Sequence, residues 1–321
     1  MCLRMRMRRV WWMLKKQGIV LALFLEIAIF SLLSSNFFSS QNAMLILRQC
    51  ATIGVMGCGM TFVIIGGNFD LSVGSLLSLC CCISLTMHDY IGAIPAILFT
   101  LLVSVASGAI SGFLVGYVGL NSMIVTLGMM NVLQALALIW TDGKYYKLQD
   151  LNTWFTQIGK GNIGGIVPIS TLIMIGVIII YSLILNKTVY GYYIKAAGGN
   201  LQTCRYSGID DKKVIFKSFI LSGLATGIGA ILLSSRSGSA QSTVGAGYEF
   251  DVIAGVILGG TSLSGGSGNV FKSFIGVLIM FIMKNGFIMI GLPYYIQWIA
   301  QGVIIITSVL IDNMSRRKKG V

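Results

Sequence analysis

The chain has 321 residues, of which 55% are hydrophobic and 10% are charged, and its mean hydropathy is +0.86. A soluble domain carries roughly a quarter charged residues, because its surface must be hydrated. The composition therefore excludes a soluble cofactor-binding fold, a secreted disulfide-linked scaffold and a disordered chain. It is typical of an all-α integral membrane protein, for which lipid is the solvent.

The net charge of +13 is concentrated near the two ends of the chain rather than spread over a soluble face. Six basic residues precede the first apolar stretch and four follow the last: Arg4, Arg6, Arg8, Arg9, Lys15 and Lys16, then Arg316, Arg317, Lys318 and Lys319. Lysine and arginine accumulate on the cytoplasmic side of membrane proteins. Residues 1–17 and 314–321 are therefore predicted to be cytoplasmic, and no nucleic-acid partner is expected.

Ten apolar windows are candidates for helices that cross the hydrocarbon core, which needs about 20 residues. They cover residues 18–38, 43–66, 71–87, 92–118, 122–141, 166–186, 214–235, 248–263, 270–290 and 294–313. The first is predicted to be an uncleaved helix rather than a signal peptide, because it is long and lacks a small-residue cleavage site. The third and eighth are short, and the polar segment 66–70 favours an interrupted helix. We expect a single transmembrane domain over 1–321.

The charges of two loops agree with this arrangement. With a cytoplasmic start, ten spans place segment 187–213 in the cytoplasm and segment 142–165 outside. The first segment carries Lys187, Lys195, Arg205, Lys212 and Lys213, whereas the three lysines of the second are offset by Asp142 and Asp150. This bias supports the even count and two cytoplasmic termini.

Glycine is abundant, with 40 residues in the chain, and it recurs at four-residue spacing in two predicted spans. Gly108, Gly112 and Gly116 follow this spacing in the fourth span, and Gly223 and Gly227 do so in the seventh. Small residues let helices approach closely in lipid, where van der Waals contact is the main attraction. The spacing predicts a closely packed bundle, although it does not by itself separate packing within one chain from packing between chains.

Two segments resemble each other, VIIGGNFDLSVGS at 63–75 and VILGGTSLSGGS at 256–267. Repeated halves with interrupted helices often line the paths of transporters, and a duplicated bundle architecture alone is the alternative. We expect a structural motif formed by Gly66, Gly67, Asp70, Ser72, Gly74, Gly259 and Gly260. The Asp70 carboxylate, followed by Leu-Ser, is predicted to cap the next helix.

The sequence shows no arrangement of residues that is typical of an enzyme site. Segment 266–273 nearly fits a phosphate-binding loop, but Phe271 stands where glycine is required and no strand precedes it. The cysteines at 80–82 are adjacent in an apolar run, and His88 is the single histidine. No paired carboxylates and no nucleophile with a base stand at a recognisable spacing. We therefore expect no catalytic residue, no metal site and no cofactor, with any ATP hydrolysis in another subunit.

Five uncharged polar residues in the predicted spans suit a path for sugars, because they can hydrogen-bond hydroxyl groups: Asn131, Gln134, Asn285, Gln297 and Gln301. Hydrogen bonding between helices explains each of them equally well. Glu26 and Lys284 are charged residues within spans, and the sequence assigns them no role. Proton-driven and sodium-driven carriers more often show intramembrane carboxylates, so the scarcity of such groups disfavours that class.

Four segments resemble, in order, the signatures of ABC importer permeases of the ribose-type monosaccharide class, within the branched-chain amino acid and sugar permease superfamily. They are GMTFVIIGGNFDLSVGS at 59–75, IVTLGMM at 124–130, GYYIKAAGGNLQTCRYSGI at 191–209 and YEFDVIAGVILGGTSLSGG at 248–266. The chain departs from the usual pattern at Thr203 and Cys204, where small alanines are common, and at Tyr206, where an aliphatic residue is common.

The resemblance implies a division of labour in the bacterial cytoplasmic membrane. Two permease chains, expected as a homodimer, form the path for a monosaccharide through the lipid. An ABC ATPase subunit drives transport, and an extracytoplasmic binding protein delivers and selects the sugar. The runner-up is a stand-alone secondary carrier or channel for a small polar solute, which would transport without an ATPase.

The cytoplasmic segment 187–213 is expected to couple the permease to the ATPase. A Gly-Gly-Asn break precedes a short stretch that can be helical and that ends at Ser207 and Gly208. The resemblance implies that this stretch docks on the ATPase, through Gly198, Gly199, Asn200, Arg205, Ser207, Gly208 and Ile209. From the residues alone, a solvated basic loop is the alternative.

Overall fold

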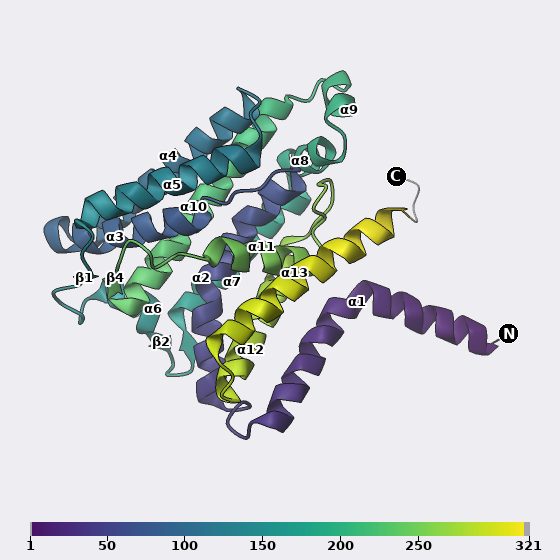
Figure 1. Cartoon of the computed structure of the whole chain (residues 1–321), viewed down its shortest axis with the longest axis horizontal. Helices are drawn as coiled ribbons and strands as arrows, with labels where there is room; N and C mark the ends of the chain where they lie inside the picture. Colours follow the sequence, from purple (N-terminus) through teal and green to yellow (C-terminus); the bar gives the residue numbers. More distant parts are fainter. Residues whose placement is uncertain (1, 318–321) are drawn as a thin grey trace.

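The computed structural model describes the backbone of residues 2–317 and the side chains of residues 18–307, 309 and 310. Within these residues the chain is mostly helical and has almost no sheet, which confirms the all-α prediction (Figure 1). The helices are α1 (Cys2–Leu33), α2 (Ser40–Ile65), α3 (Val73–Ile91), α4 (Ala93–Gly116), α5 (Ser122–Thr141), α6 (Trp154–Lys160), α7 (Ile169–Lys187), α8 (Val189–Gly199), α9 (Leu201–Tyr206), α10 (Asp211–Ser237), α11 (Tyr248–Leu258), α12 (Val270–Met289) and α13 (Tyr294–Arg317).

Four two-residue strands form two small antiparallel pairs. β1 (Tyr146–Lys147) pairs with β4 (Ser239–Ala240), and β2 (Asn162–Ile163) pairs with β3 (Val167–Pro168). The first pair joins the loop after α5 to the segment after α10, although the two are far apart in the sequence. The strands lie at one end of the helix bundle, which we call the strand end (Figure 1).

Seven helices of the described part of the chain are long and apolar enough to cross a membrane. They are α2, α3, α4, α5, α7, α10 and α12. Shorter apolar stretches lie at Gly18–Leu33 in α1 and at Tyr294–Thr307 in α13. The eighth predicted window holds α11, whose 11 residues extend about 16 Å at 1.5 Å per residue, about half the hydrocarbon thickness. The window therefore contains an interrupted helix, and the count of ten crossings stays a prediction.

The helix α2 lies at the centre of the bundle, and every residue from Cys50 to Gly66 is buried. The long helix α10 packs against α2, α3 and α4. The predicted glycine faces meet in the contact between α4 and α10. A Cβ on Gly112 would lie 2.8 Å from the Phe216 carbonyl oxygen, and a Cβ on Gly116 would lie 2.7 Å from that of Lys212. Gly223 of α10 faces Gly108 and Ser104 of α4 in turn. The four-residue glycine spacing therefore serves packing within this chain.

The 27 residues of α10 extend about 40 Å and separate two ends of the bundle. Its first residue, Asp211, contacts α9, and β4 follows its last residue, Ser237. Figure 1 shows α8 and α9 together at the end opposite to β1 and β4, which we call the α9 end. The segments 142–165 and 187–213 thus lie at opposite ends of the bundle, as the predicted topology requires.

Candidate coupling segment and translocation path

The segment predicted to couple the chain to an ATPase contains the short helix that its sequence indicates. The helix α8 ends at Gly199, and the Asn200 side chain accepts a hydrogen bond from the Thr203 backbone N–H at 3.0 Å, which caps α9. At the other end of α9, Gly208 adopts a φ of 74°, and the Ile209 N–H donates to the Cys204 carbonyl at 3.0 Å. Asparagine and glycine therefore set both limits of the six-residue helix.

A bidentate ion pair fixes α9 to the start of α10. The Arg205 Nε donates to both carboxylate oxygens of Asp211, at 3.2 and 3.1 Å, and its Nη2 donates to Oδ2 at 2.8 Å. The Asp211 side chain is 8% exposed and that of Arg205 is 61% exposed. Hydrogen bonding to Asp211, and secondly the charge of that carboxylate, raise the pKa of the Arg205 guanidinium above its ordinary value. The ion pair thus joins α9 to a helix that runs the length of the bundle.

The end of α8 meets two glycine turns at the α9 end, and we call this contact of Gly198 with Gly67 and Gly265 the glycine junction. The Gly266 N–H donates to the Ile65 carbonyl at 2.8 Å. A Cβ on Gly265 would lie 2.6 Å from the Gly198 carbonyl oxygen and 3.0 Å from the Gly67 Cα, and a Cβ on Gly198 would overlap the Ile65 carbonyl oxygen. Only glycine lets these backbones approach so closely. The segment 187–213 therefore rests on both copies of the internal repeat.

The two copies of the repeat end their helices in the same way. After α2, the Gly67 N–H donates to Ile64 and the Asn68 N–H donates to Val63, at 2.9 and 3.0 Å. After α11, the N–H groups of Gly260 and Thr261 donate to the equivalent carbonyls of residues 257 and 256, at 2.8 and 3.3 Å. Gly67 and Gly260 have φ values of 76° and 84°, which disfavour any side chain. The sequence similarity is thus also a similarity of backbone structure.

The other residues of the predicted motif hold the bundle together. The Asp70 carboxylate, 2% exposed, accepts hydrogen bonds from the Ser72 N–H at 3.1 Å, the Ser72 hydroxyl at 2.6 Å and the Ser222 hydroxyl of α10 at 3.0 Å. It therefore joins the start of α3 to α10. A Cβ on Gly259, which follows α11, would lie 2.5 Å from the Ser273 Cα of α12. Gly66 caps α2, and its N–H donates to the Phe62 carbonyl at 2.9 Å.

The five polar residues predicted for the path do not gather at one place. Asn285 pairs with Asn42 of α2 through two amide hydrogen bonds, at 3.0 and 2.8 Å, and is 8% exposed. Gln134 donates to the Ser242 carbonyl at 2.8 Å. Asn131 is exposed on α5, and Gln297 is half-buried on α13. Asn285 thus makes the contact between helices that was the alternative for it, and Gln134 joins α5 to the loop before α11.

Gln301 contacts an ion pair between Asp251 and Lys284, which the sequence did not predict. Its Nε2 donates to Asp251 Oδ1 at 2.8 Å, and the Lys284 Nζ lies 2.5 Å from the same oxygen. Asp251 and Lys284 are opposite charges in two apolar windows, and such charges in lipid require partners. This rule could have predicted the pair. By contrast, Glu26 Oε2 is enclosed without a hydrogen-bond partner among the described residues.

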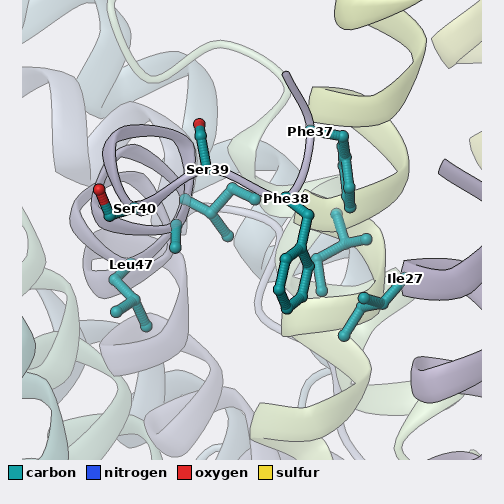
Figure 2. Close-up of a pocket in the computed structure, with 9 residues that line it drawn as sticks. Ile27, Phe37, Phe38, Ser39, Ser40 and Leu47 are labelled. Carbon is teal, nitrogen blue, oxygen red and sulfur yellow. The ribbon is translucent and has the colours of Figure 1, made fainter. Parts of the chain in front are cut away.

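Three cavities are distinguished by their chemistry. The first, of about 500 Å³, lies between α1, the turn before α2 and α12 (Figure 2). Its lining is apolar except for Ser39 and Ser40, so it does not suit a polyhydroxy compound. The second, of about 470 Å³, lies at the α9 end against Gly67, Gly198 and Arg205. The third, of about 720 Å³, combines Asp251, Lys284 and Gln301 with aromatic side chains.

Comparisons with known proteins agree over most of the chain. Residues 42–309 match the family model described as the permease component of the branched-chain amino acid transport system. The ribose import permease protein of Escherichia coli (strain K12) is 37% identical over 309 residues, which cover 94% of each chain. The ribose import permease protein of Bacillus subtilis (strain 168) is 36% identical over 301 residues, which cover 94% of this chain and 93% of the relative. The L-arabinose transport system permease protein of Escherichia coli (strain K12) is 31% identical over 319 residues, 97% and 93% of the two chains. No solved structure matches the chain.

Proposed function

This chain belongs to the family of branched-chain amino acid transport system permease components, and we propose that it carries a monosaccharide through the cytoplasmic membrane of a bacterium. It is the permease subunit of a sugar-importing ABC transporter, a multi-pass membrane protein and not itself an enzyme. Its relatives are named for ribose and L-arabinose, which supports a pentose or a related sugar as the cargo.

The observation that carries the proposal is the contact of α8 with the glycine junction, together with the ion pair that joins α9 to α10. A subunit driven from outside the membrane needs a rigid element that receives the movement and backbone contacts that pass it on. The six residues of α9 are held by Arg205 to α10, and α8 contacts both repeats through Gly198. An ATPase domain that moves α9 would therefore move three parts of the bundle at once.

The partners follow from this arrangement. The ATPase subunit binds the α9 end, where Tyr206 is 90% exposed and Leu201 is 42% exposed. An extracytoplasmic sugar-binding protein delivers the sugar at the strand end, and a second copy of the permease completes the path as a homodimer surrounded by lipid. No nucleic acid takes part.

The α9 end faces the cytoplasm in this proposal, with both termini on the same side and ten crossings between them. The basic residues of 187–213 and of the two termini support this orientation. The whole of 1–321 acts as one transmembrane unit. Residues 198–200, Arg205 and 207–209 transmit the movement of the ATPase, and Asn131, Gln297 and Gln301 contribute to the path.

Reconstitution tests the proposal directly. The chain, purified with its ATPase, is placed in liposomes with the binding protein, and uptake of radiolabelled ribose, arabinose, xylose and galactose is followed with and without ATP. We expect uptake of at least one of these sugars only with ATP and all three components. Transport by the chain alone, driven by an ion gradient, would establish the secondary carrier instead.

A further inference from the structure

An ion pair lies inside the helix bundle, at the first turn of α11. Asp251 and Lys284 of α12 are 13% and 21% exposed, and Gln301 of α13, 8% exposed, donates to the same carboxylate oxygen as the lysine. Three helices therefore place a carboxylate, an ammonium group and an amide within hydrogen-bonding distance. Ionisable residues within membrane segments are costly and characteristically face a path or a water-filled cavity.

These three side chains line the cavity of about 720 Å³, and their hydrogen-bonding capacity is incompletely used. Among the described residues, Asp251 Oδ2 and the carbonyl oxygen of Gln301 accept no hydrogen bond, and the Lys284 ammonium group has Asp251 as its one partner. A sugar hydroxyl both donates and accepts. Hydroxyl groups could therefore bind to all three side chains without breaking the ion pair.

Aromatic side chains complete the lining. Tyr248, Phe250 and Trp298 face the same cavity, and the Trp298 side chain is 68% exposed. An aromatic ring offers a flat apolar surface to the C–H face of a sugar ring while polar groups bind its hydroxyls. The apolar cavity in Figure 2 has aromatic side chains too but lacks charged groups, so it does not offer this combination.

The position of α11 links this cavity to the α9 end. The helix begins at Tyr248 on the cavity, and the chain that follows its last residue reaches the glycine junction at Gly265. From Asp251 to Leu258 the helix extends about 10 Å at 1.5 Å per residue. The helix α11 and the loop of residues 259–265 therefore connect the charged group to the glycine junction.

We propose that Asp251, Lys284 and Gln301 form a binding site for the hydroxyl groups of the transported monosaccharide, with Trp298 as the surface for its ring. This inference rests on the proposed function, because it assigns a place on the path to the sugar. The alternative is an ion pair that only joins α11 to α12. The two roles differ when both charges are removed together, since replacing a buried pair by apolar residues of similar volume often leaves a protein stable.

The test measures uptake by the complete transporter with the double variant Asp251→Leu/Lys284→Met and with the single variant Gln301→Leu. Both are expected to lower the rate of ATP-dependent uptake at least tenfold, about the effect of one hydrogen bond to a charged group. The amount of ATPase bound to the permease is expected to stay unchanged. Gln241→Leu is the matched control, since Gln241 is exposed between β4 and α11 and does not line the cavity, and it is expected to leave uptake unchanged.

A second measurement does not depend on the folding of these variants. Ala246→Cys places a thiol on the cavity, and Ile179→Cys places one on the exposed apolar face of α7. We expect a small charged thiosulfonate reagent to modify residue 246 and not residue 179, and we expect the imported sugar to slow the modification. No reaction at residue 246, or a reaction that the sugar does not slow, would overturn the binding site.

The outcomes separate this inference from the proposed function. If the wild-type transporter imports sugar while the double variant and Gln301→Leu import it at the wild-type rate, the binding site is refuted and the function stands. If the wild-type transporter imports none of the four sugars, the function fails, and the binding site fails with it.

Discussion

Gly74, in the first turn of α3, leaves the space that the carboxylate of Glu249 occupies. A Cβ at residue 74 would overlap Glu249 Oε2 and would lie 2.7 Å from the Gly245 carbonyl oxygen. Glu249 belongs to the first turn of α11 and is 6% exposed. The starts of α3 and α11 therefore meet inside the bundle, with a carboxylate at the positive ends of two helix dipoles.

Substitution of this glycine should loosen the contact between the two helices. We expect Gly74→Ala to destabilise the chain by about 1–3 kcal/mol, the cost of overpacking a filled interior. Thermal inactivation in detergent, followed by size-exclusion chromatography, measures the change. Gly128→Ala is the control, because a Cβ at Gly128 of α5 meets no atom within 4 Å. Equal thermal stability of the two variants would contradict the overlap.

Loss of the ion pair between Arg205 and Asp211 should uncouple ATP hydrolysis from transport. Arg205→Lys keeps the charge but not the bidentate geometry, and Asp211→Asn removes the charge that faces the guanidinium. In both variants we expect ATP hydrolysis by the complex to continue while uptake of sugar falls about tenfold, as for a charged hydrogen bond. The ratio of sugar imported to ATP hydrolysed is the measurement. Lys212→Gln, an exposed neighbour, should keep the wild-type ratio.

Replacement by alanine should have opposite effects at Gly198 of the glycine junction and at its neighbour Gly199. Gly198→Ala would press a methyl group into the Ile65 carbonyl oxygen, whereas a Cβ at Gly199 meets no atom within 4 Å. We expect Gly198→Ala to cost about 1–3 kcal/mol and to abolish transport. Gly199 belongs to the same coupling segment, but a methyl group there displaces no neighbour, so Gly199→Ala should remain near wild type in both properties. Uptake in cells, corrected for the amount of permease in the membrane, compares them, and equal uptake would show that the close approach is not required.

Local signals explain what the sequence could predict. The limits of α9 are set by Asn200 and Gly208 within a stretch of nine residues, so they could be read from neighbouring positions. The glycine spacing in α4 and α10 predicted close helix packing for the same reason. A structural motif that includes Gly66 and Gly259 was expected because the sequence repeats there.

Contacts between distant parts of the chain could not be predicted in this way. The approach of Gly198 to Ile65 depends on how the end of α8 packs against the turns that follow α2 and α11, and no spacing in the sequence encodes this packing. Asn285 was a candidate for the path because it is polar within a span, yet Asn42 satisfies it from a helix more than two hundred residues away. Asp251 was not predicted as a site residue, because it lies in the first turn of a helix, where an acidic residue is ordinary.

The pair of Asn42 and Asn285 should act as a link between α2 and α12. Asn285→Ala leaves the buried Asn42 Oδ1 without its partner, while Asn42 Nδ2 keeps the Phe37 carbonyl, and we expect a loss of about 1–3 kcal/mol. The double variant Asn42→Leu/Asn285→Leu removes both polar groups and should be more stable than the single variant. Thermal inactivation of the three proteins provides the comparison. A stable Asn285→Ala protein that fails to transport sugar would indicate that Asn285 acts in the path rather than as a link between helices.

Engineered cysteines test which end of the bundle faces the cytoplasm. Tyr206 at the α9 end is 90% exposed and Tyr145 near the strand end is 63% exposed, whereas the native Cys204 is only 2% exposed. We expect an impermeant maleimide to label Tyr145→Cys in intact cells and Tyr206→Cys only in inverted membrane vesicles. The unsubstituted chain measures the background from native thiols. Labelling of Tyr206→Cys from outside would invert the orientation and remove α9 from the reach of a cytoplasmic ATPase.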